Sequence, residues 1–404
     1  MNEQKVPKLR FPEFTGEWEE KKLGDISKNI SYGMNSASTV YDGKNKYIRI
    51  TDISEKNNRF IPNPLTSPLE IVDEKFKLKK NDLLFARTGA STGKTYLYKE
   101  EDGNIFFAGF LIKFEIKNSY NSKFVFYNTL KNSYKKWIKI MSFRSGQPGI
   151  NAEEYKILKI NFPSLPEQEK IADFLTLFDK EIELEEKKLE LLKENKKGYM
   201  QKIFSQELRF KDEFGNDYPQ WEEKKLGEIL ILNLRPVPKP SIPYETLGIR
   251  SHAKGTMHKK IENPNNISMD TLYKVKENDF IVRITFAWEH AVAICKKEDT
   301  GRLVSHRFPT YVAKLNLNIN YFKHYIKRKQ FKFSLAMISP GGAGRNRVMS
   351  KKDFPNIRCI LPSLPEQEKI ANFLSMADEE IELMENKIEK LKEIKKGLLQ
   401  QMFI

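Results

Sequence analysis

The sequence predicts an α+β protein with a pseudo-twofold internal repeat, in which two mixed α/β globular regions alternate with two long, antiparallel coiled-coil helices. Three observations predict this arrangement. A block of 43 residues occurs twice, both copies carry a heptad pattern of apolar residues, and strand-like and helix-like segments alternate outside them. A chain of 404 residues with 39% hydrophobic residues is long enough for more than one core.

The duplication sets the domain boundaries. Residues 162–204 and 361–403 align without a gap and are identical at about two-thirds of positions, and Trp18–Gly24 recurs as Trp221–Gly227. A shorter match joins Leu9-Arg10-Phe11 to Leu208-Arg209-Phe210. The expected parts are an N-terminal segment 1–17 that completes the repeat, a globular region 18–163, a helix 164–204, a linker 205–220, a second globular region 221–362 and a second helix 363–404.

Both repeated blocks are predicted to be helices. Ser164 with Glu167, and Ser363 with Glu366, have the S-x-x-E spacing of a capping box at a helix start. The apolar residues beyond them step by three and four, which is the pattern of a coiled-coil seam. The predicted seam consists of Ile171, Leu175, Phe178, Ile182, Leu189, Leu192, Ile370, Leu374, Ile381, Ile388 and Leu391.

Charge separates the helices from the rest of the chain. The helical arms carry net charges of −2 (10 acids against 8 lysines) and −3 (9 against 6), whereas the whole chain carries +16, so the globular regions hold the basic excess. This distribution favours two polyanion-binding regions on a nearly neutral frame. Glu185, Lys196 and Lys395 fall on the seam, and we expect them to loosen its packing.

The two globular regions follow one plan although their sequences differ. Strands are expected at 46–50, 82–87 and 106–116 and again at 244–250, 279–283 and 302–315, basic helices at 123–139 and 321–333, and Gly-rich loops at 142–149 and 339–347. Glycine lets the backbone approach a partner closely, and Arg, Gln and Asn make bidentate contacts with base edges. Solvated surface turns and helix faces are the alternative.

The residues predicted to contact DNA combine these loops with the basic helices and strand ends. They are Arg87, Lys94, Lys135, Lys136, Arg144, Gln147, Arg283, Lys327, Arg328, Arg345, Asn346 and Arg347.

No catalytic motif is found in the sequence. Gly89–Thr95 resembles a phosphate-binding loop but has three residues between its glycines where the motif needs four, so we expect a turn between strands. The five histidines and two cysteines have no metal-ligand spacing, and no Pro-Pro occurs, as an adenine methyltransferase motif would require. No apolar run is long enough to cross a membrane, and the unpaired cysteines fit the cytoplasm.

Two basic domains, each followed by a Pro-Ser-Leu-Pro-Glu-Gln-Glu-Lys-Ile helix, resemble the specificity subunit of a Type I restriction–modification system. Ala86–Lys94 also resembles a common form of that family's first target-recognition domain, from which Val282–Trp288 departs. The resemblance implies a non-catalytic subunit whose two target-recognition domains read the halves of an asymmetric DNA site. The helices would set the unread spacer and dock two modification subunits, which bring S-adenosylmethionine. Restriction subunits would join through these and bring ATP and Mg²⁺ chemistry, and the chain itself would bind no cofactor.

Two other functions fit parts of the sequence. One is a coiled-coil scaffold that binds proteins or an anionic surface without DNA specificity, which a steep salt dependence of duplex binding would argue against. The other is a free-standing DNA-modifying enzyme, which would methylate or cut DNA without partners.

Overall fold

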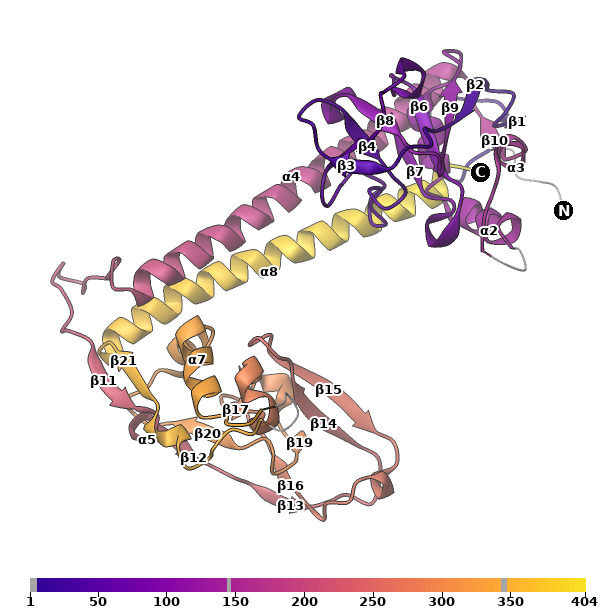
Figure 1. Cartoon of the computed structure of the whole chain (residues 1–404). Coiled ribbons are helices and arrows are strands. Elements are labelled where there is room, and N and C mark those ends of the chain that lie inside the picture. The colour runs from indigo at the N-terminus through magenta and orange to yellow at the C-terminus, as the bar shows by residue number, and fades with distance from the viewer. Residues whose placement is uncertain (1–5, 144–146, 343–346) are drawn as a thin grey trace. The chain divides into compact units, whose positions relative to one another are not determined.

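The computed structural model describes residues 6–143, 147–342 and 347–404 (Figure 1). The chain divides into two compact units, residues 1–187 with 386–404 and residues 188–385. Each unit therefore contains one globular region together with parts of both long helices. The mixed content of helices and sheets confirms the predicted α+β class.

The first globular region is built on an antiparallel four-stranded sheet of order β2-β9-β6-β7. Three two-stranded sheets accompany it, of which β4-β8 is parallel and β1-β10 and β3-β5 are antiparallel. The strands are β1 (Glu19–Lys22), β2 (Ser27–Tyr32), β3 (Ser38–Val40), β4 (Lys46–Ile48), β5 (Thr66–Pro68), β6 (Asp82–Ala86), β7 (Thr95–Leu97), β8 (Ile105–Phe107), β9 (Leu111–Ile116) and β10 (Lys159–Phe162). The helices are α1 (Ser122–Asn128), α2 (Asn132–Met141) and α3 (Ala152–Lys156), with 3-10 turns η1 (Glu74–Phe76), η2 (Gly89–Ser91) and η3 (Glu100–Asp102).

The second globular region has an antiparallel four-stranded sheet, β12-β20-β17-β18, and a mixed five-stranded sheet, β13-β16-β19-β14-β15. Its strands are β11 (Glu222–Lys225), β12 (Leu230–Leu232), β13 (Pro236–Pro238), β14 (Tyr244–Ile249), β15 (Thr256–Ile261), β16 (Thr271–Lys274), β17 (Phe280–Val282), β18 (Val292–Ile294), β19 (Leu303–Val304), β20 (Thr310–Ala313) and β21 (Arg358–Leu361). Its helices are α5 (Leu226–Ile229), α6 (Ile319–Tyr325) and α7 (Lys329–Met337), with 3-10 turns η4 (Pro264–Asn266), η5 (Ile284–Glu289), η6 (Lys297–Asp299) and η8 (Phe354–Asn356).

One central strand in each region separates two apolar cores. In β6, Leu83 and Phe85 pack into the core beneath the helices, whereas Leu84 packs into a second core on the opposite face. In β17, Phe280 and Ile281 divide in the same way. Because successive side chains of a strand point to opposite faces, a strand buried on both sides reads as an unbroken apolar run.

The acid that begins each central strand is buried and paired. Asp82 accepts a hydrogen bond from the Lys79 amide at 2.9 Å, and its carboxylate lies 3.5 Å from the Lys113 ammonium. Burial nevertheless raises the pKa of Asp82. The Asp279 carboxylate likewise accepts a hydrogen bond from the Lys276 amide at 2.8 Å, and it accepts two more from the Arg235 guanidinium, at 2.6 and 2.9 Å. Both acids thus help to fix the strand that leads to the loops described below.

The repeated segments form the frame that joins each globular region to its helix. The Trp-Glu-Glu-Lys-Lys segment becomes β1 or β11 and pairs with the strand directly before the helix, with Glu19 opposite Phe162 and Glu222 opposite Leu361. That strand leads into the long helices α4 (Leu165–Phe204) and α8 (Leu364–Gln401). The segments that are repeated in the sequence therefore pair with each other in both globular regions.

The predicted capping boxes are not formed by the glutamates of the repeat. Glu366 instead accepts two hydrogen bonds from Arg209, at 3.1 and 2.8 Å, while the Ser363 hydroxyl has no partner among the residues described. Glu167 likewise accepts two hydrogen bonds from Arg10, both at 2.8 Å. An arginine offers a charge-assisted pair of bonds that a backbone amide cannot match.

Four predicted elements are each divided in two. The strand expected at 106–116 turns at Gly109, where the Leu111 amide donates to the Ala108 carbonyl, and the strand expected at 302–315 becomes β19 and β20. The expected basic helices break at Lys131 and Arg328, both of which have extended backbones. Each break places the cation over an aromatic ring of its own unit, Lys131 over Phe403 and Arg328 over Phe204.

The two long helices run antiparallel within each unit, as their ion pairs show. In the first unit Asp179 pairs with Lys395 and Glu186 with Lys392; in the second, Lys196 pairs with Asp378 and Lys193 with Glu385. Every predicted seam residue is buried or half-buried. Each of the three charges expected on the seam has a partner of opposite sign: Lys196 pairs with Asp378, Lys395 with Asp179 and Glu185 with Lys387. That these charges loosen the packing stays a prediction.

Candidate nucleic-acid interface

Two loops far apart in the sequence lie side by side in the first globular region. The turn after β6 and the segment 147–150 are joined by backbone bonds: the Gly89 amide donates to the Pro148 carbonyl at 2.9 Å, and the Ile150 amide donates to the Arg87 carbonyl at 2.9 Å. The Gln147 side chain packs against Gly89, with its amide nitrogen 3.0 Å from where a Cβ would stand. The structure thus brings together Arg87 and Gln147, two of the residues predicted to contact DNA.

Arg87 is held in place by an aromatic ring. Its guanidinium carbon lies 4.9 Å from the centre of the Tyr32 ring, and the side chain stays half-buried. Stacking of this kind restricts the guanidinium while leaving its N–H groups free to donate. Arg144, also predicted to contact DNA, lies outside the residues described.

The segment Gly89–Thr95 is a turn between strands, as predicted. Gly89 and Gly93 have φ values of 69° and 88°, and strand β7 follows the turn where a phosphate-binding loop would lead into an α-helix. A Cβ on Gly93 would stand 2.7 Å from Ile138 of α2, so glycine is required there. Lys94, at the end of the turn, is mostly covered and forms an ion pair with Glu55 at 3.1 Å.

Helix α2 presents lysines to solvent beside this turn. Its apolar face, with Trp137 and Ile138, packs on the core beneath the helices of the first region. The Tyr134 hydroxyl donates to the Gly93 carbonyl at 3.0 Å. Lys135 and Lys136 are exposed on the opposite face, where neither forms an ion pair with any residue that the structure describes.

The second globular region repeats this pairing of loops with different side chains. The Met349 amide donates to the Ile284 carbonyl at 2.9 Å, and the Ile284 amide donates to the Arg307 carbonyl at 3.0 Å. In the first region the residue with the same two contacts is Arg87, which receives a bond from Ile150 and donates to Phe110. Arg283 therefore lies one residue earlier on the shared frame than Arg87.

Aromatic rings surround Arg283. Its guanidinium carbon lies 4.2 Å from the Phe286 ring centre and 5.7 Å from that of Phe308. Burial, and then the neighbouring Arg307, lower the pKa of Arg283. A partly buried cation next to a second cation favours the approach of an anion or of an electron-rich base edge.

Other residues of the second region that were predicted to contact DNA make contacts within the protein instead. Arg347 donates to the carbonyls of Ser339 and Ala336 at the end of α7, at 3.2 and 3.3 Å, and stacks on Trp288. Arg328 lies at the other end of α7 and stacks on Phe204. Because α7 has nine residues, its two ends are about 13 Å apart.

Lys327 lies beside the long helix, 4.0 Å from Asp378, where burial lowers its pKa. Arg345 and Asn346 lie outside the part of the chain that the structure describes.

Sequence reasoning missed one basic loop of the second region. The tip of the β14–β15 hairpin carries exposed Arg250 and Lys254, and between them His252 and Ala253 have positive φ values of 63° and 51°. The His252 amide donates to the Glu289 carbonyl at 2.9 Å, which attaches the tip to η5, next to Arg283. Gly255 between two strand-like segments was the available signal.

A left-handed conformation is uncommon for residues other than glycine, so the surrounding bonds must maintain it. The second region therefore presents a constrained basic loop next to its paired loops.

Among residues 6–143, 147–342 and 347–404 no group of three His, Cys, Asp or Glu side chains could hold a metal ion. Within the same ranges, no helix is both long enough and apolar enough to span a bilayer.

Comparison with known proteins gives one family. The sequence profile of the Type I restriction modification DNA specificity domain matches residues 15–194 and 219–393. The putative type I restriction enzyme MjaX specificity subunit of Methanocaldococcus jannaschii is 26% identical, covering 98% of this chain and 95% of the relative. The MjaVIII specificity subunit of the same organism is 25% identical, covering 97% and 92%.

Among solved structures, the S subunit of a Type I restriction–modification system from M. genitalium has the same fold, with a TM-score of 0.61 at 18% identity and 99% of each chain covered. The family match covers most of the chain and falls on both globular regions and both long helices. The chain belongs to the family of Type I restriction–modification specificity subunits.

Proposed function

We propose that the chain reads a bipartite, asymmetric site in double-stranded DNA, one half with each globular region. The two regions, residues 18–163 and 221–362, are called here the first and second recognition domains. The observation that carries the proposal is the paired loops: both domains join the turn after the central strand to the loop before the long helix. On that shared frame the side chains differ, so the two half-sites should differ in sequence.

Base reading in the first domain is assigned to Arg87 and Gln147. Arginine makes two parallel hydrogen bonds to the guanine edge, and glutamine makes two to the adenine edge. The Tyr32 ring fixes Arg87, and glycine at position 89 lets Gln147 lie against the turn. Lys94 forms an ion pair with Glu55, so its ammonium group is less available to DNA.

In the second domain Arg283 is assigned to base reading, and Arg250 and Lys254 of the hairpin tip are added to it. The aromatic neighbours of Arg283 hold its guanidinium as Tyr32 holds Arg87. Phosphate contacts are assigned to exposed Lys135 and Lys136.

The contacts of Lys327, Arg328 and Arg347 suit a role in holding α7 and the long helices, and we rank these three below the other candidates. Arg345, Asn346 and Arg144 remain candidates for base contacts on the strength of the sequence alone.

The long helices are proposed to dock two modification subunits. Leu177, Leu184 and Leu191 are spaced by seven residues on α4 and are 65%, 56% and 57% exposed. Met376 and Leu383 form the corresponding exposed pair on α8. Repeated apolar side chains left in solvent at heptad spacing favour a partner surface. Leu184→Glu should therefore reduce co-purification of a modification subunit, whereas Glu190→Lys on the same helix should not.

Specificity subunits of this family are non-catalytic, and the enzymatic activity lies on partner subunits. We place adenine methylation with S-adenosylmethionine on the modification subunits. Restriction subunits, joined through them, would carry ATP-driven translocation and Mg²⁺-dependent cleavage.

The experiment that tests the proposal maps methylated adenines in the genome with and without the gene. The expected result is one bipartite motif that disappears on deletion. A scaffold without DNA specificity would leave the map unchanged. Methylation by the purified chain alone would contradict a non-catalytic role and indicate a free-standing enzyme.

A further inference from the structure

One turn of the first recognition domain contacts the long helix α4 within its own unit. Residues 54–59 fold back on themselves, with the Ser54 amide donating to the Arg59 carbonyl at 2.9 Å and the Asn58 amide donating to the Ser54 carbonyl at 3.0 Å. The Asn58 side chain donates to the Thr95 carbonyl at 2.8 Å, which ties the turn to β7. The turn is thus a rigid part of the domain.

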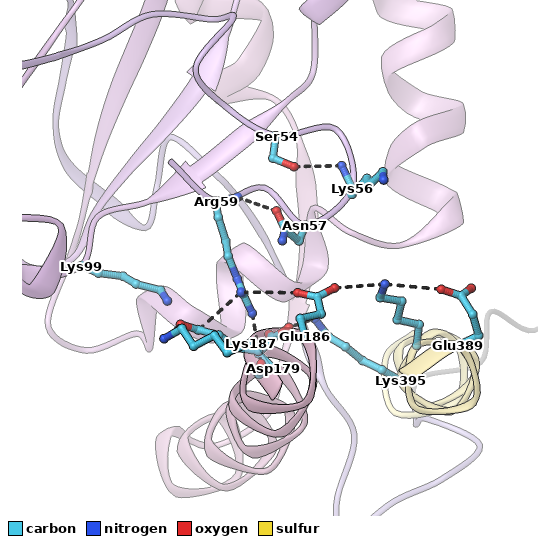
Figure 2. Close-up of polar contacts among 12 residues, drawn as sticks. Ser54, Lys56, Asn57, Arg59, Lys99, Asp179, Glu186, Lys187, Glu389 and Lys395 are labelled. Atoms are coloured by element: carbon cyan, nitrogen blue, oxygen red, sulfur yellow. Dashed lines mark hydrogen bonds and ion pairs between the residues drawn. The ribbon is translucent and has the colours of Figure 1, made fainter. Parts of the chain in front are cut away.

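Arg59 extends from this turn to α4 (Figure 2). Its guanidinium donates to the Asp179 carbonyl at 3.1 Å and lies 3.4 Å from the Glu183 carboxylate and 4.0 Å from that of Glu186. The arginine side chain is only 21% exposed. A guanidinium that donates to a helix carbonyl and lies between two carboxylates fixes a direction as well as a distance.

The contact continues to the second helix of the unit. Glu186 pairs with Lys392 at 3.0 Å, and Lys392 pairs with Glu389 at 3.4 Å, which gives the row of alternating charges drawn in Figure 2. Arg59 is therefore the one link of this row that belongs to the recognition domain.

The second recognition domain has no equivalent arginine within the described ranges. Glu382 occupies on α8 the position that Glu183 occupies on α4, 199 residues earlier, and it is exposed without an ion pair to any described residue. The corresponding turn at 250–255 bonds to its own domain at Glu289 and His290. The helix carries the acid in both repeats, but only the first domain uses it.

We propose that Arg59 is a positioning residue that fixes the angle of the first recognition domain on its helix pair and thereby sets how strictly one spacer length is preferred. This inference rests on the proposed reading of a bipartite site. One added base pair moves a half-site by about 3.4 Å and turns it by about 35° around the duplex. A domain held at one angle rejects such a site, whereas a domain free to tilt tolerates it.

The test uses the full chain in complex with its modification subunits and duplexes carrying the mapped site, with the spacer at its natural length or changed by one base pair. Arg59→Ala should lower the preference for the natural spacer about tenfold, while affinity for the natural site changes much less. Arg59→Lys, which keeps the charge but loses the fork of donors, should recover part of the preference. The fold should survive, because Lys187 and Lys392 still neutralise Glu183 and Glu186.

Lys187→Ala is the matched control, because it removes a partner of Glu183 that comes from the helix itself, at 2.8 Å. It should leave spacer preference unchanged. If Arg59→Ala keeps the natural preference, or weakens all spacers by the same factor, Arg59 only stabilises the fold and the inference is overturned. If the complex without any substitution shows no preference for any DNA site, the proposed function fails as well. That outcome is distinct from a result in which only the inference about Arg59 fails.

Discussion

Replacing Glu366 by glutamine tests whether the repeated motifs are held together by their buried carboxylates. Glu366 is fully buried, accepts two bonds from Arg209 and accepts a third from the Trp221 indole at 3.1 Å. The neutral amide would set two N–H groups against the arginine donors. Removing one partner of a buried pair costs about 3–5 kcal/mol.

The lower end of that range applies, because Arg209 is 19% exposed and also donates to the carbonyls of Tyr218 and Pro219. We therefore expect Glu366→Gln to lower the free energy of unfolding of the second unit by about 3 kcal/mol. Urea unfolding of the full chain measures this, with hydrogen exchange of residues 208–221 as the local report.

Two comparisons make the result decisive. Glu368→Gln, an exposed residue half a turn along α8, should change stability by less than about 0.5 kcal/mol. Glu167→Gln should cost the first unit about 1 kcal/mol less than Glu366→Gln costs the second, because the Trp18 indole nitrogen makes no bond to it. A Glu366→Gln protein as stable as the Glu368→Gln protein would refute the reasoning.

Three further predictions concern DNA and pH. Arg87→Ala should weaken the preference for the correct base in the first half-site only, and Arg283→Ala in the second only. Each variant should lower this preference by about 5- to 150-fold in competition binding. A loss of preference in both halves from either variant would contradict the assignment. Lys135→Ala or Lys136→Ala should reduce the slope of log affinity against log salt by about 0.9 without altering specificity, and an unchanged slope would remove that lysine from the phosphate contacts. Burial lowers the pKa of His324 below its ordinary 6.5, so the unfolded chain binds the proton more readily and stability should fall as pH drops below about 6.5. His324→Gln should flatten that acid-side slope in urea titrations, and an undiminished slope would assign it to other groups.

The frame of the fold could be predicted from the sequence because its signals are local and duplicated. Heptad spacing revealed both long helices, and acid-led apolar runs revealed both central strands. The helix breaks at Lys131 and Arg328 could not be predicted, because no proline or glycine marks them. At each break the cation lies over an aromatic ring that is distant in the sequence, Phe403 or Phe204.

The candidate interface, too, could be predicted from the sequence only in part. The Gly-rich loops and strand ends were recognisable by composition, but their contact through Gly89 and Pro148 depends on a pairing between distant segments. The capping-box spacing was misleading at Glu366, because local rules cannot show that an arginine 157 residues away competes for the carboxylate. The contact of Arg59 with α4 could not be predicted for the same reason, since its acceptor, the Asp179 carbonyl, lies more than 100 residues along the chain.

The central claim is that each recognition domain reads its own half of the DNA site. Exchanging residues 18–163 for the corresponding domain of another family member, then mapping methylated adenines in cells that carry the complete complex, tests it most directly. The account predicts that one half of the motif changes while the other half is kept. A map in which both halves change, or neither does, would contradict it.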